Sequence, residues 1–401
     1  MSWDTFKLSD CCVSITDGDH LPPPKADSGI PFVTISNINT INQFDFTNTM
    51  FVPQDYYDKL DSKRKAQIGD VLYSVVGSFG IPVYIKDNRQ FVFQRHIAIL
   101  RPNEKILPRF LYYTMLSRDF YAKADAVAVG AAQRTVGLTS LRNIKIDVPT
   151  IDEQNKIVNI LSAYDDLIEN NQKQIDLLEE AAQRLYKEWF VDLCFPGHEN
   201  TPIVDGIPQG WRVLELGNAF KTLLGGTPSR AKAEYWEKGT IPWINSGKVN
   251  ELRVVEPSEY ITDIALDKSA TKLLPKHTTL VAITGATLGQ VSYTEIETCA
   301  NQSVVGIIDE TQCYSEYVYC YVSNNIKRII GKATGGAQQH INKDIVNNFP
   351  IVIPEESISS VFKNIAKPYF EKINALLVEN IKLAEARDRL LPKLMSGELE
   401  V

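Results

Sequence analysis

Residues 157–189 alternate apolar and polar positions in the manner of a helix that packs along one partner helix. The apolar positions recur at intervals of four and three residues, and most positions between them are acidic, amide or lysine side chains. This heptad spacing is typical of a narrow coiled-coil seam. The predicted seam consists of Ile157, Leu161, Tyr164, Ile168, Asn171, Ile175, Leu178, Ala182, Leu185 and Trp189.

The same pattern returns later in the chain. A shift of 205 residues places Pro149 on Pro354 and Tyr164 on Tyr369 without a gap, which indicates an internal duplication. The two helices are therefore expected to pair, with an asparagine in each seam fixing the register; the alternative is that each helix packs on its own globular domain. The second predicted seam consists of Phe362, Ala366, Tyr369, Ile373, Leu376, Asn380, Leu383, Arg387, Leu390 and Leu394.

Short apolar runs in residues 1–150 predict a mixed domain of strands and helices. Strands are expected at 32–38, 71–76, 82–85 and 97–101, and a helix is expected at 108–117. Residues 212–354 repeat the order of these features at offsets that drift from 211 to 205 residues, so the two domains share a frame and differ in loop length. Three prolines and three glycines in residues 194–211 predict a linker between them.

Polar side chains gather at the predicted strand ends of both domains. Amide, hydroxyl and guanidinium groups on loops can form hydrogen bonds with base edges and phosphates, although such residues are also ordinary loop composition. The candidate DNA contacts are Thr34, Ser36, Asn37, Ser78, Arg95, His96, Gln133 and Arg134 in the first domain and Asn245, Ser246, Lys248, Thr287, Asn301, Gln302, Gln338 and Gln339 in the second.

Composition places these domains in a cytoplasmic protein. The N-terminus lacks the basic start and apolar run of a signal peptide, and no run of 18 apolar residues predicts a membrane span. The six cysteines form no CxxC pair. Residues 151–200 carry 4 Lys and Arg against 11 Asp and Glu, which equals the net charge of −7 of the whole chain. The acidity therefore lies on the first long helix and leaves each domain close to neutral.

Candidate enzymatic motifs are weak. Asp17, Asp19 and His20 offer potential metal ligands on one turn, but no second cluster completes a site, and a polar turn is the favoured interpretation. His96, His198, His277 and His340 stand apart from any arrangement typical of nucleophilic catalysis. There is no GxxxxGK[ST] motif. We expect no catalytic residue, metal site or cofactor site in this chain.

Four stretches resemble the specificity (S) subunit of type I restriction-modification enzymes. They are PTIDEQNKIVNIL from Pro149, LYKEWFVDLCFPG from Leu185, GGTPSRAKAEYWEKGTIPWINSGKV from Gly225 and ARDRLLPKLMSGEL from Ala386. The resemblance covers essentially the whole chain, and the third and fourth stretches are the most specific. In the first domain ITDGDH stands in place of GGTPSR, and resembles another common version of the family's opening loop.

The resemblance implies an α+β fold with two target recognition domains, at 1–150 and 196–354. These are small mixed sheets with helices. The helices at 151–195 and 355–401 are the family's conserved spacers, which pair as an antiparallel coiled coil with pseudo-twofold symmetry.

The resemblance also implies a non-catalytic subunit that reads an asymmetric bipartite target in double-stranded DNA. Its expected protein partners are two methyltransferase subunits and, in restricting complexes, two restriction subunits. The expected cofactors, S-adenosylmethionine and ATP with magnesium, belong to those partners. The alternative is a coiled-coil adaptor whose two domains bind peptide or glycan.

Overall fold

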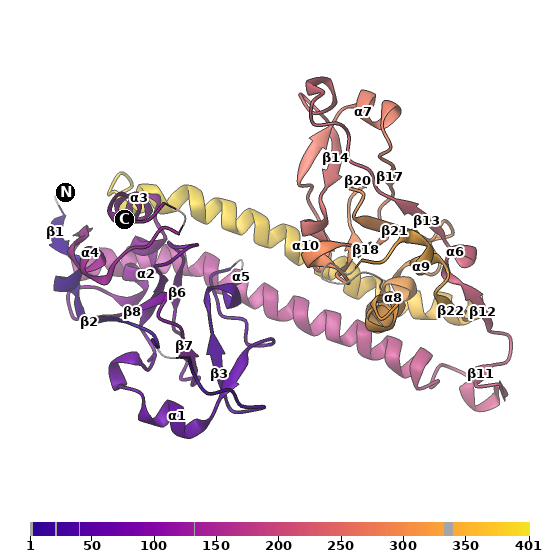
Figure 1. Cartoon of the computed structure of the whole chain (residues 1–401), viewed down its shortest axis with the longest axis horizontal. Coiled ribbons are helices and arrows are strands. Elements are labelled where there is room, and N and C mark those ends of the chain that lie inside the picture. The colour runs from indigo at the N-terminus through magenta and orange to yellow at the C-terminus, as the bar shows by residue number, and fades with distance from the viewer. Residues whose placement is uncertain (1–2, 21, 40, 132, 333–339) are drawn as a thin grey trace. The chain divides into compact units, whose positions relative to one another are not determined.

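The computed structural model describes residues 3–20, 22–39, 41–131, 133–332 and 340–401 (Figure 1). The chain divides into two compact units. The first unit comprises residues 1–168 and 382–401, and the second comprises residues 169–381. Each unit therefore contains one globular part together with one segment of each long helix.

The long helices are α5 (Ile151–Tyr186), drawn in magenta in Figure 1, and α10 (Glu356–Met395), drawn in yellow. In the first unit, Ile157 near the start of α5 shares a core with Leu394 near the end of α10. In the second unit, Trp189 just beyond the end of α5 shares a core with Phe362 near the start of α10. The predicted antiparallel pairing of the two helices is therefore confirmed.

The buried stripe on each helix is wider than the predicted seam. Asn171 is 2% exposed, and its Nδ2 donates to Oδ1 of Asn380 at 3.0 Å. Tyr186 and Phe370 lie beside the seam and are also buried. The globular parts pack against the same helices, so positions that flank the seam are covered as well.

Local sequence explains where α5 begins and ends. Thr150 and Glu153 form a capping box, in which the Glu153 carboxylate accepts from the backbone nitrogen of Thr150 at 3.1 Å. A π-helical turn over Lys187–Val191 continues the helix. Pro196 and Gly197 follow within the linker predicted at residues 194–211, and neither residue favours continuing a helix.

The first unit is built on an antiparallel sheet of order β2-β8-β5-β6, formed by β2 (Cys12–Asp17), β8 (Ile97–Pro102), β5 (Val71–Ser74) and β6 (Pro82–Tyr84). A smaller sheet has the order β4-β3-β7, with β4 (Met50–Val52), β3 (Ile30–Val33) and β7 (Val92–Phe93). A further pair joins β1 (Asp4–Lys7) to β9 (Lys145–Val148). The helices are α1 (Gln54–Lys59), α2 (Pro108–Leu116), α3 (Arg118–Val127) and α4 (Leu138–Asn143).

The second unit repeats this plan with additions. Its main sheet is β13-β21-β18-β19-β15, formed by β13 (Lys221–Leu224), β21 (Val304–Ile308), β18 (Thr279–Ala282), β19 (Val291–Thr294) and β15 (Arg253–Val254). The smaller sheet is β16-β14-β20-β17, with β16 (Glu259–Ile261), β14 (Ile241–Ile244), β20 (Thr298–Ala300) and β17 (Leu273–Leu274). Two further pairs are β12 (Arg212–Glu215) with β22 (Pro350–Ile353), and β10 (Ile203–Val204) with β11 (Ile207–Pro208). The helices are α6 (Leu216–Ala219), α7 (Asp263–Lys268), α8 (Ser315–Ile330) and α9 (Lys343–Asn347).

The predicted α+β class with a repeated domain is confirmed, and one predicted strand is wrong in extent. The strand expected at 32–38 ends at Val33 and gives way to a 3₁₀ turn over Ile35–Asn37. The reason is local, because the Asn37 side-chain oxygen accepts from the Thr34 backbone nitrogen at 2.9 Å and folds the chain back.

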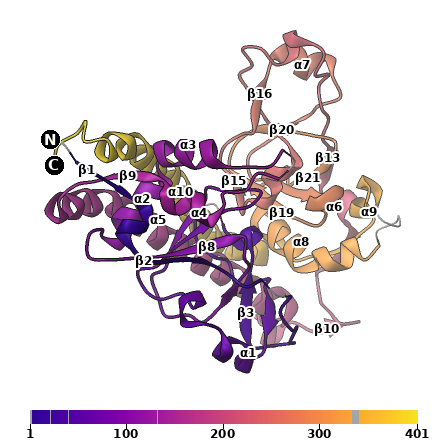
Figure 2. The same ribbon diagram turned by 60° about the vertical axis from the view of Figure 1, so that its left-hand side comes forward.

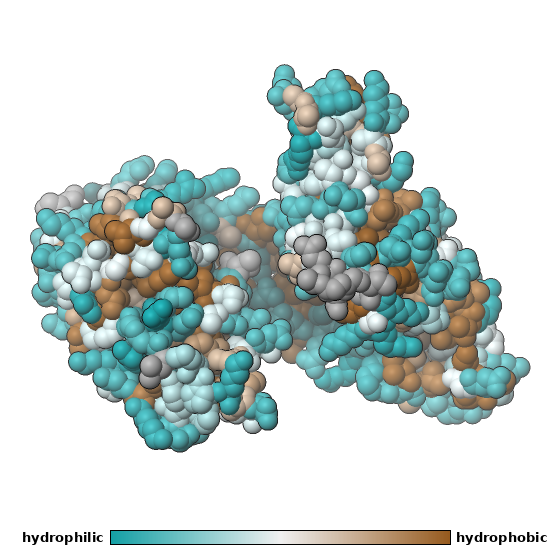
Figure 3. All heavy atoms as spheres, in the orientation of Figure 1, coloured by the Kyte–Doolittle hydropathy of each residue, from teal (hydrophilic) through white to brown (hydrophobic). Residues whose placement is uncertain are grey.

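Trp3 near the start of the chain lies beside Gly397 near its end in the first unit, and Figure 2 shows β1 close to the end of α10. Lys156 of α5 donates from Nζ to the backbone oxygen of Val401 at 2.9 Å. Hydrophilic side chains cover much of each unit on the face drawn in Figure 3. Among the described residues, no helix is both long enough and apolar enough to cross a membrane.

Candidate nucleic-acid interface

Three loops of the first unit meet at one end of its main sheet. The backbone nitrogen of Val75, just after β5, donates to the His96 oxygen at 2.8 Å. The Val75 oxygen accepts from the nitrogen of Val136 at 2.8 Å, and Gly77 donates to the Arg134 oxygen at 2.9 Å. This three-loop junction brings together five of the predicted DNA contacts, namely Ser78, Arg95, His96, Gln133 and Arg134.

The second unit contains the same three-loop junction. The nitrogen of Ile283, just after β18, donates to the Ser303 oxygen at 2.9 Å, and the Ile283 oxygen accepts from Ile341 at 3.0 Å. Gly77 and Gly285 hold equivalent places, each with a φ of +69°, which favours glycine. The junction carries the predicted contacts Thr287, Asn301 and Gln302, whereas Gln338 and Gln339 lie outside the described residues.

A turn beside each junction holds the remaining predicted residues. In the first unit Gln94 donates to the Val33 oxygen at 3.2 Å, which places the turn at Thr34, Ser36 and Asn37 next to the 94–96 loop. In the second unit Asn301 donates to the Ile244 oxygen at 3.0 Å, which places Asn245, Ser246 and Lys248 in the same relation. Each unit therefore assembles its predicted polar residues along neighbouring loops.

The assembled side chains differ in how freely they could meet a ligand. Arg95 is exposed, and among the residues that the structure describes its side chain has no hydrogen-bond or ion-pair partner. Arg134 is paired with Asp125 at 3.1 Å. Lys248 is paired with Glu251 at 2.8 Å, and its side chain is only 17% exposed. Arg95 is thus the cation of these three that is available without breaking an internal contact.

Amide groups of the second unit are partly used within the protein. The Asn245 side-chain oxygen accepts from the Gly247 nitrogen at 2.8 Å, and the Gln302 side-chain oxygen accepts from Thr227 at 2.5 Å. Both amides keep their NH₂ groups as donors. The first unit presents an arginine and the second presents amide donors, so the two junctions differ in chemistry.

The turn at Asp17, Asp19 and His20 is held by internal contacts. His20 Nε2 lies 2.9 Å from Asp17 Oδ2, and the Tyr56 hydroxyl donates to Asp19. Within the described part of the chain, no group of three or more His, Cys, Asp or Glu side chains is arranged to hold a metal ion.

The repeated frame agrees with the sequence comparison. The family described as the type I restriction modification DNA specificity domain matches this chain at residues 2–180 and again at residues 208–379. The chain belongs to this family. The two matches fall on the two copies of the frame.

Related proteins match over most of their length. One is the type I restriction enzyme MjaIX specificity subunit of Methanocaldococcus jannaschii, which is 28% identical over 309 residues, or 75% of this chain and 71% of that protein. Another is the HindI specificity subunit of Haemophilus influenzae, which is 25% identical over 440 residues, or 92% and 95% of the two chains. The crystal structure of an S subunit from M. genitalium has a TM-score of 0.58 at 16% identity and covers 98% of this chain and 96% of its own, so it shares the fold.

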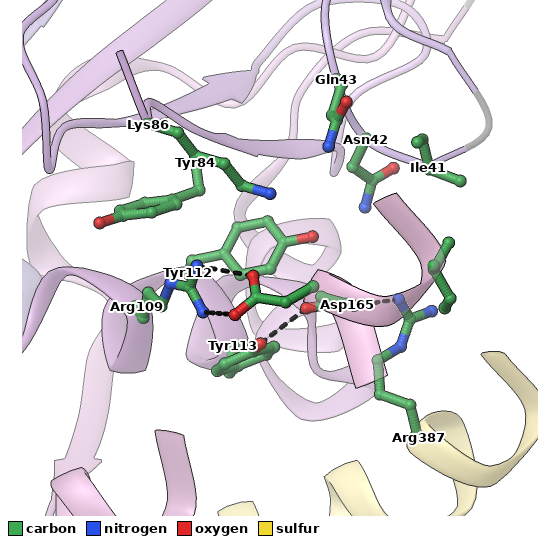
Figure 4. A pocket seen from close by; sticks show the side chains of 12 residues that line it. Ile41, Asn42, Gln43, Tyr84, Lys86, Arg109, Tyr112, Tyr113, Asp165 and Arg387 are labelled. Atoms are coloured by element: carbon green, nitrogen blue, oxygen red, sulfur yellow. Dashed lines mark hydrogen bonds and ion pairs between the residues drawn. The ribbon is translucent and has the colours of Figure 1, made fainter. Parts of the chain in front are cut away.

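This specificity subunit also contains polar residues that the sequence pattern did not single out as a site. In the first unit, Arg109 of α2 donates two hydrogen bonds to Asp166 of α5 at 2.8 and 3.0 Å. The neighbouring Asp165 accepts from the Tyr113 hydroxyl and from Arg387 of α10, both at 2.6 Å. We call these residues the first polar cluster, and Figure 4 shows them around an open recess.

Burial sets the protonation of the first polar cluster. Burial, reinforced by the Asp165 charge, raises the pKa of Tyr113 well above its ordinary value, so its hydroxyl stays a donor. Burial works to lower the pKa of Arg387, but Asp165 more than offsets it, so the guanidinium stays charged. One signal was present in the sequence, because Arg387 occupies a seam position where an apolar residue is usual.

The second unit has a more deeply buried counterpart. Arg253 of β15 is 1% exposed and donates from Nη2 to Oε2 of Glu179 in α5 at 2.7 Å. The other Glu179 oxygen accepts from the Tyr319 hydroxyl of α8 at 3.0 Å and from Gln183 at 2.9 Å. We call Glu179, Gln183, Arg253 and Tyr319 the second polar cluster. It joins a globular part to a long helix, as the first polar cluster does.

Proposed function

We propose that this specificity subunit binds double-stranded DNA and reads an asymmetric bipartite target. The observation that carries the proposal is the three-loop junction, which occurs in both units with two equivalent backbone hydrogen bonds and with different side chains. Two domains that share a backbone frame are expected to approach DNA in a similar geometry. Because their loop side chains differ, they are expected to prefer different base sequences. Arg95 supplies a guanidinium suited to guanine or phosphate, and the second junction supplies amide donors.

The long helices are proposed to space the two readers and to bind the partner subunits. The excess of seven acidic residues in 151–200 is poorly suited to lie along phosphates, and suits a basic protein surface instead. By the family resemblance, those partners are two methyltransferase subunits and, in restricting complexes, two restriction subunits. We propose that they bind S-adenosylmethionine and ATP with magnesium and supply the chemistry, while this chain supplies no catalytic group.

The test is a change in one reader with the other left intact. The bipartite target is first found by sequencing methylated DNA from cells that express this chain with its partner subunits. Binding of the assembled complex is then measured on duplexes with single base changes in either half-site. Arg95→Ala should reduce discrimination by about 1 to 3 kcal/mol at one position of one half-site and leave the other half-site unchanged.

Controls separate the alternatives. Lys59→Ala on α1 removes an exposed cation that is paired with Asp55, and should change neither half-site. An equal loss of affinity for every sequence would place Arg95 on a phosphate rather than a base. Binding that needs no duplex and does not weaken with salt would contradict DNA recognition and favour an adaptor for peptide or glycan.

A further inference from the structure

Arg253 lies where the second globular part meets both long helices. Its guanidinium carbon is 4.4 Å from the ring centroids of Tyr319 in α8 and Phe370 in α10, and 5.5 Å from that of Tyr293 in β19. Its ion pair with Glu179 adds α5 to these contacts. One side chain thus contacts the sheet and helix of the globular part and also both spacer helices.

The hydrogen bonds around Glu179 restrict the position of its carboxylate and so the geometry of its ion pair with Arg253. Its two carboxylate oxygens accept from Arg253, Tyr319 and Gln183, and Gln183 in turn accepts from Asn324 of α8 at 2.6 Å. Arg253 also donates from Nη1 to the backbone oxygen of Leu252 at 2.9 Å, while its Nε is buried without a hydrogen-bond partner. A buried charge pair of this kind is specific in geometry, because a displacement leaves each charge without its partner.

The residue before Arg253 adds a second contact between the globular part and the long helices. Leu252 packs against the helix core of Ile175, Ile373 and Leu376. The backbone of Arg253 meanwhile pairs with Tyr293 in the main sheet. Two consecutive residues therefore tie the sheet that carries the junction loops to the helix pair.

The shared frame does not itself require this arrangement. The offset between the units falls from 211 residues at Ile30 to 209 at Val52, so Arg253 aligns with residues 42–44, which are Asn42, Gln43 and Phe44. Asn42 lines an open recess of the first unit rather than filling it (Figure 4). The first unit uses Arg109 of α2 instead, and its partner Asp166 has a side chain that is 52% exposed. The described residues of the first unit therefore hold no equivalent of Arg253 at the aligned positions.

We propose that Arg253 is the positioning residue that fixes the second reader on the spacer helices and so restricts the gap allowed between the two half-sites. This inference rests on the proposed function. Arg253 would touch no base, so its role is separate from reading sequence.

The first experiment needs no DNA. In the full chain with Cys194 and Cys313 changed to serine, spin labels are placed at Tyr260→Cys in the second reader and Val361→Cys on α10, both exposed positions. Electron–electron resonance then gives the distribution of distances between the labels. Arg253→Met should widen that distribution about twofold with the helix content unchanged, whereas Arg212→Met at an exposed site of β12 should not widen it. An unchanged width for Arg253→Met would overturn the proposal.

The second experiment measures gap selectivity in the assembled complex. Duplexes carry the identified half-sites with the preferred gap, or with a gap one base pair longer or shorter. Unaltered protein should prefer the correct gap by roughly tenfold, and Arg253→Met should reduce that preference to about threefold or less. Arg253→Lys, which keeps the charge, should restore part of the preference.

The readouts distinguish the possible failures. Discrimination within each half-site should stay unchanged in Arg253→Met, and loss of half-site discrimination would make Arg253 a general structural residue and contradict the proposal. If the unaltered protein prefers none of the duplexes, the proposed function fails. The distances between the spin labels would still decide whether Arg253 fixes the second globular part on the long helices.

Discussion

The two units hold the long helices by different means. At the offset that aligns the helices, Asp165 of the first unit corresponds to Phe370 of the second. Asp165 binds Arg387 and Tyr113 with its side chain partly exposed, whereas Phe370 is 2% exposed and packs on Tyr293 and Tyr319. The duplicated frame kept its three-loop junction while its contacts with the helices diverged. The strength of these contacts is therefore set separately in each unit.

The largest expected difference concerns the aromatic contact itself. Phe370→Ala should destabilise the second unit by about 3 to 5 kcal/mol, because it leaves a cavity between two aromatic rings and the Arg253 guanidinium. Asp165→Ala at the corresponding place should cost the first unit about 1 to 3 kcal/mol for the hydrogen bonds it loses. Hydrogen exchange of amides in α8 and α2 reports the two units separately. Equal costs would mean that the two contacts are energetically alike.

A second difference should appear as a pH dependence of the second unit. Glu295, which is 9% exposed, has its pKa raised from 4.5 to about 7, chiefly by burial and against the opposing charge of Arg253. Between these values the unfolded chain is ionised and the folded chain is not, so stability falls as pH rises. The loss from pH 4.5 to 7 should be about 3 kcal/mol.

The variant Glu295→Gln should remove most of this loss. Urea unfolding at pH 5 and pH 8, followed through hydrogen exchange in α8, measures it. Glu256→Gln is the control, since Glu256 is exposed and should show no such effect. Tyr293 holds the strand position that Tyr84 holds in the first unit, so the residue that corresponds to Glu295 is Lys86. Amides of α2 should therefore show no matching fall in stability. A variant that keeps the full pH dependence would rule out Glu295 as its source.

The smallest expected effect is at the exposed ion pair of the first unit. Arg109→Met removes a contact to Asp166 that is open to solvent, and should cost about 1 kcal/mol or less. The cost should shrink further in 1 M salt because exposed charges are screened. Hydrogen exchange of the α2 amides, measured at low and at high salt, gives this loss of stability under both conditions. A large loss of stability that does not depend on salt would mean that the ion pair of the first polar cluster is shielded from solvent as well as that of the second.

The regular parts of this fold could be predicted from sequence. The helix seam, β5, β6, β8 and α2 follow from periodicity and turn residues, and the structure places them within a few residues of expectation. The helix α3 was missed because it begins immediately after α2, where Ser117 caps it by accepting from the Phe120 nitrogen at 3.2 Å. Strands of two residues, such as β15, have too little periodicity to detect.

The candidate site was predictable only in part. The sequence pattern placed Arg95 at a strand end, and it lies between β7 and β8, while Gln133 lies in the loop between α3 and α4. The structure brings both into the three-loop junction, and their contact with DNA stays a prediction. Arg253 could not be predicted as a positioning residue, because its apolar neighbours Leu252 and Val254 are typical of an ordinary strand. Its partner Glu179 is 74 residues earlier in the chain. Their pairing follows from the tertiary fold, which no local pattern encodes.

The antiparallel helix pair has a consequence for synthesis of the chain. The helix α5 ends at Tyr186, and α10 begins at Glu356, 170 residues later. At about 5 to 20 residues per second, the ribosome leaves the seam of α5 without its partner for roughly 10 to 35 s. During that time Ile175, which packs against Ile373 and Leu376 of α10, is open to contact with other nascent chains. Efficient production of this protein should therefore depend on chaperones more than its final stability suggests.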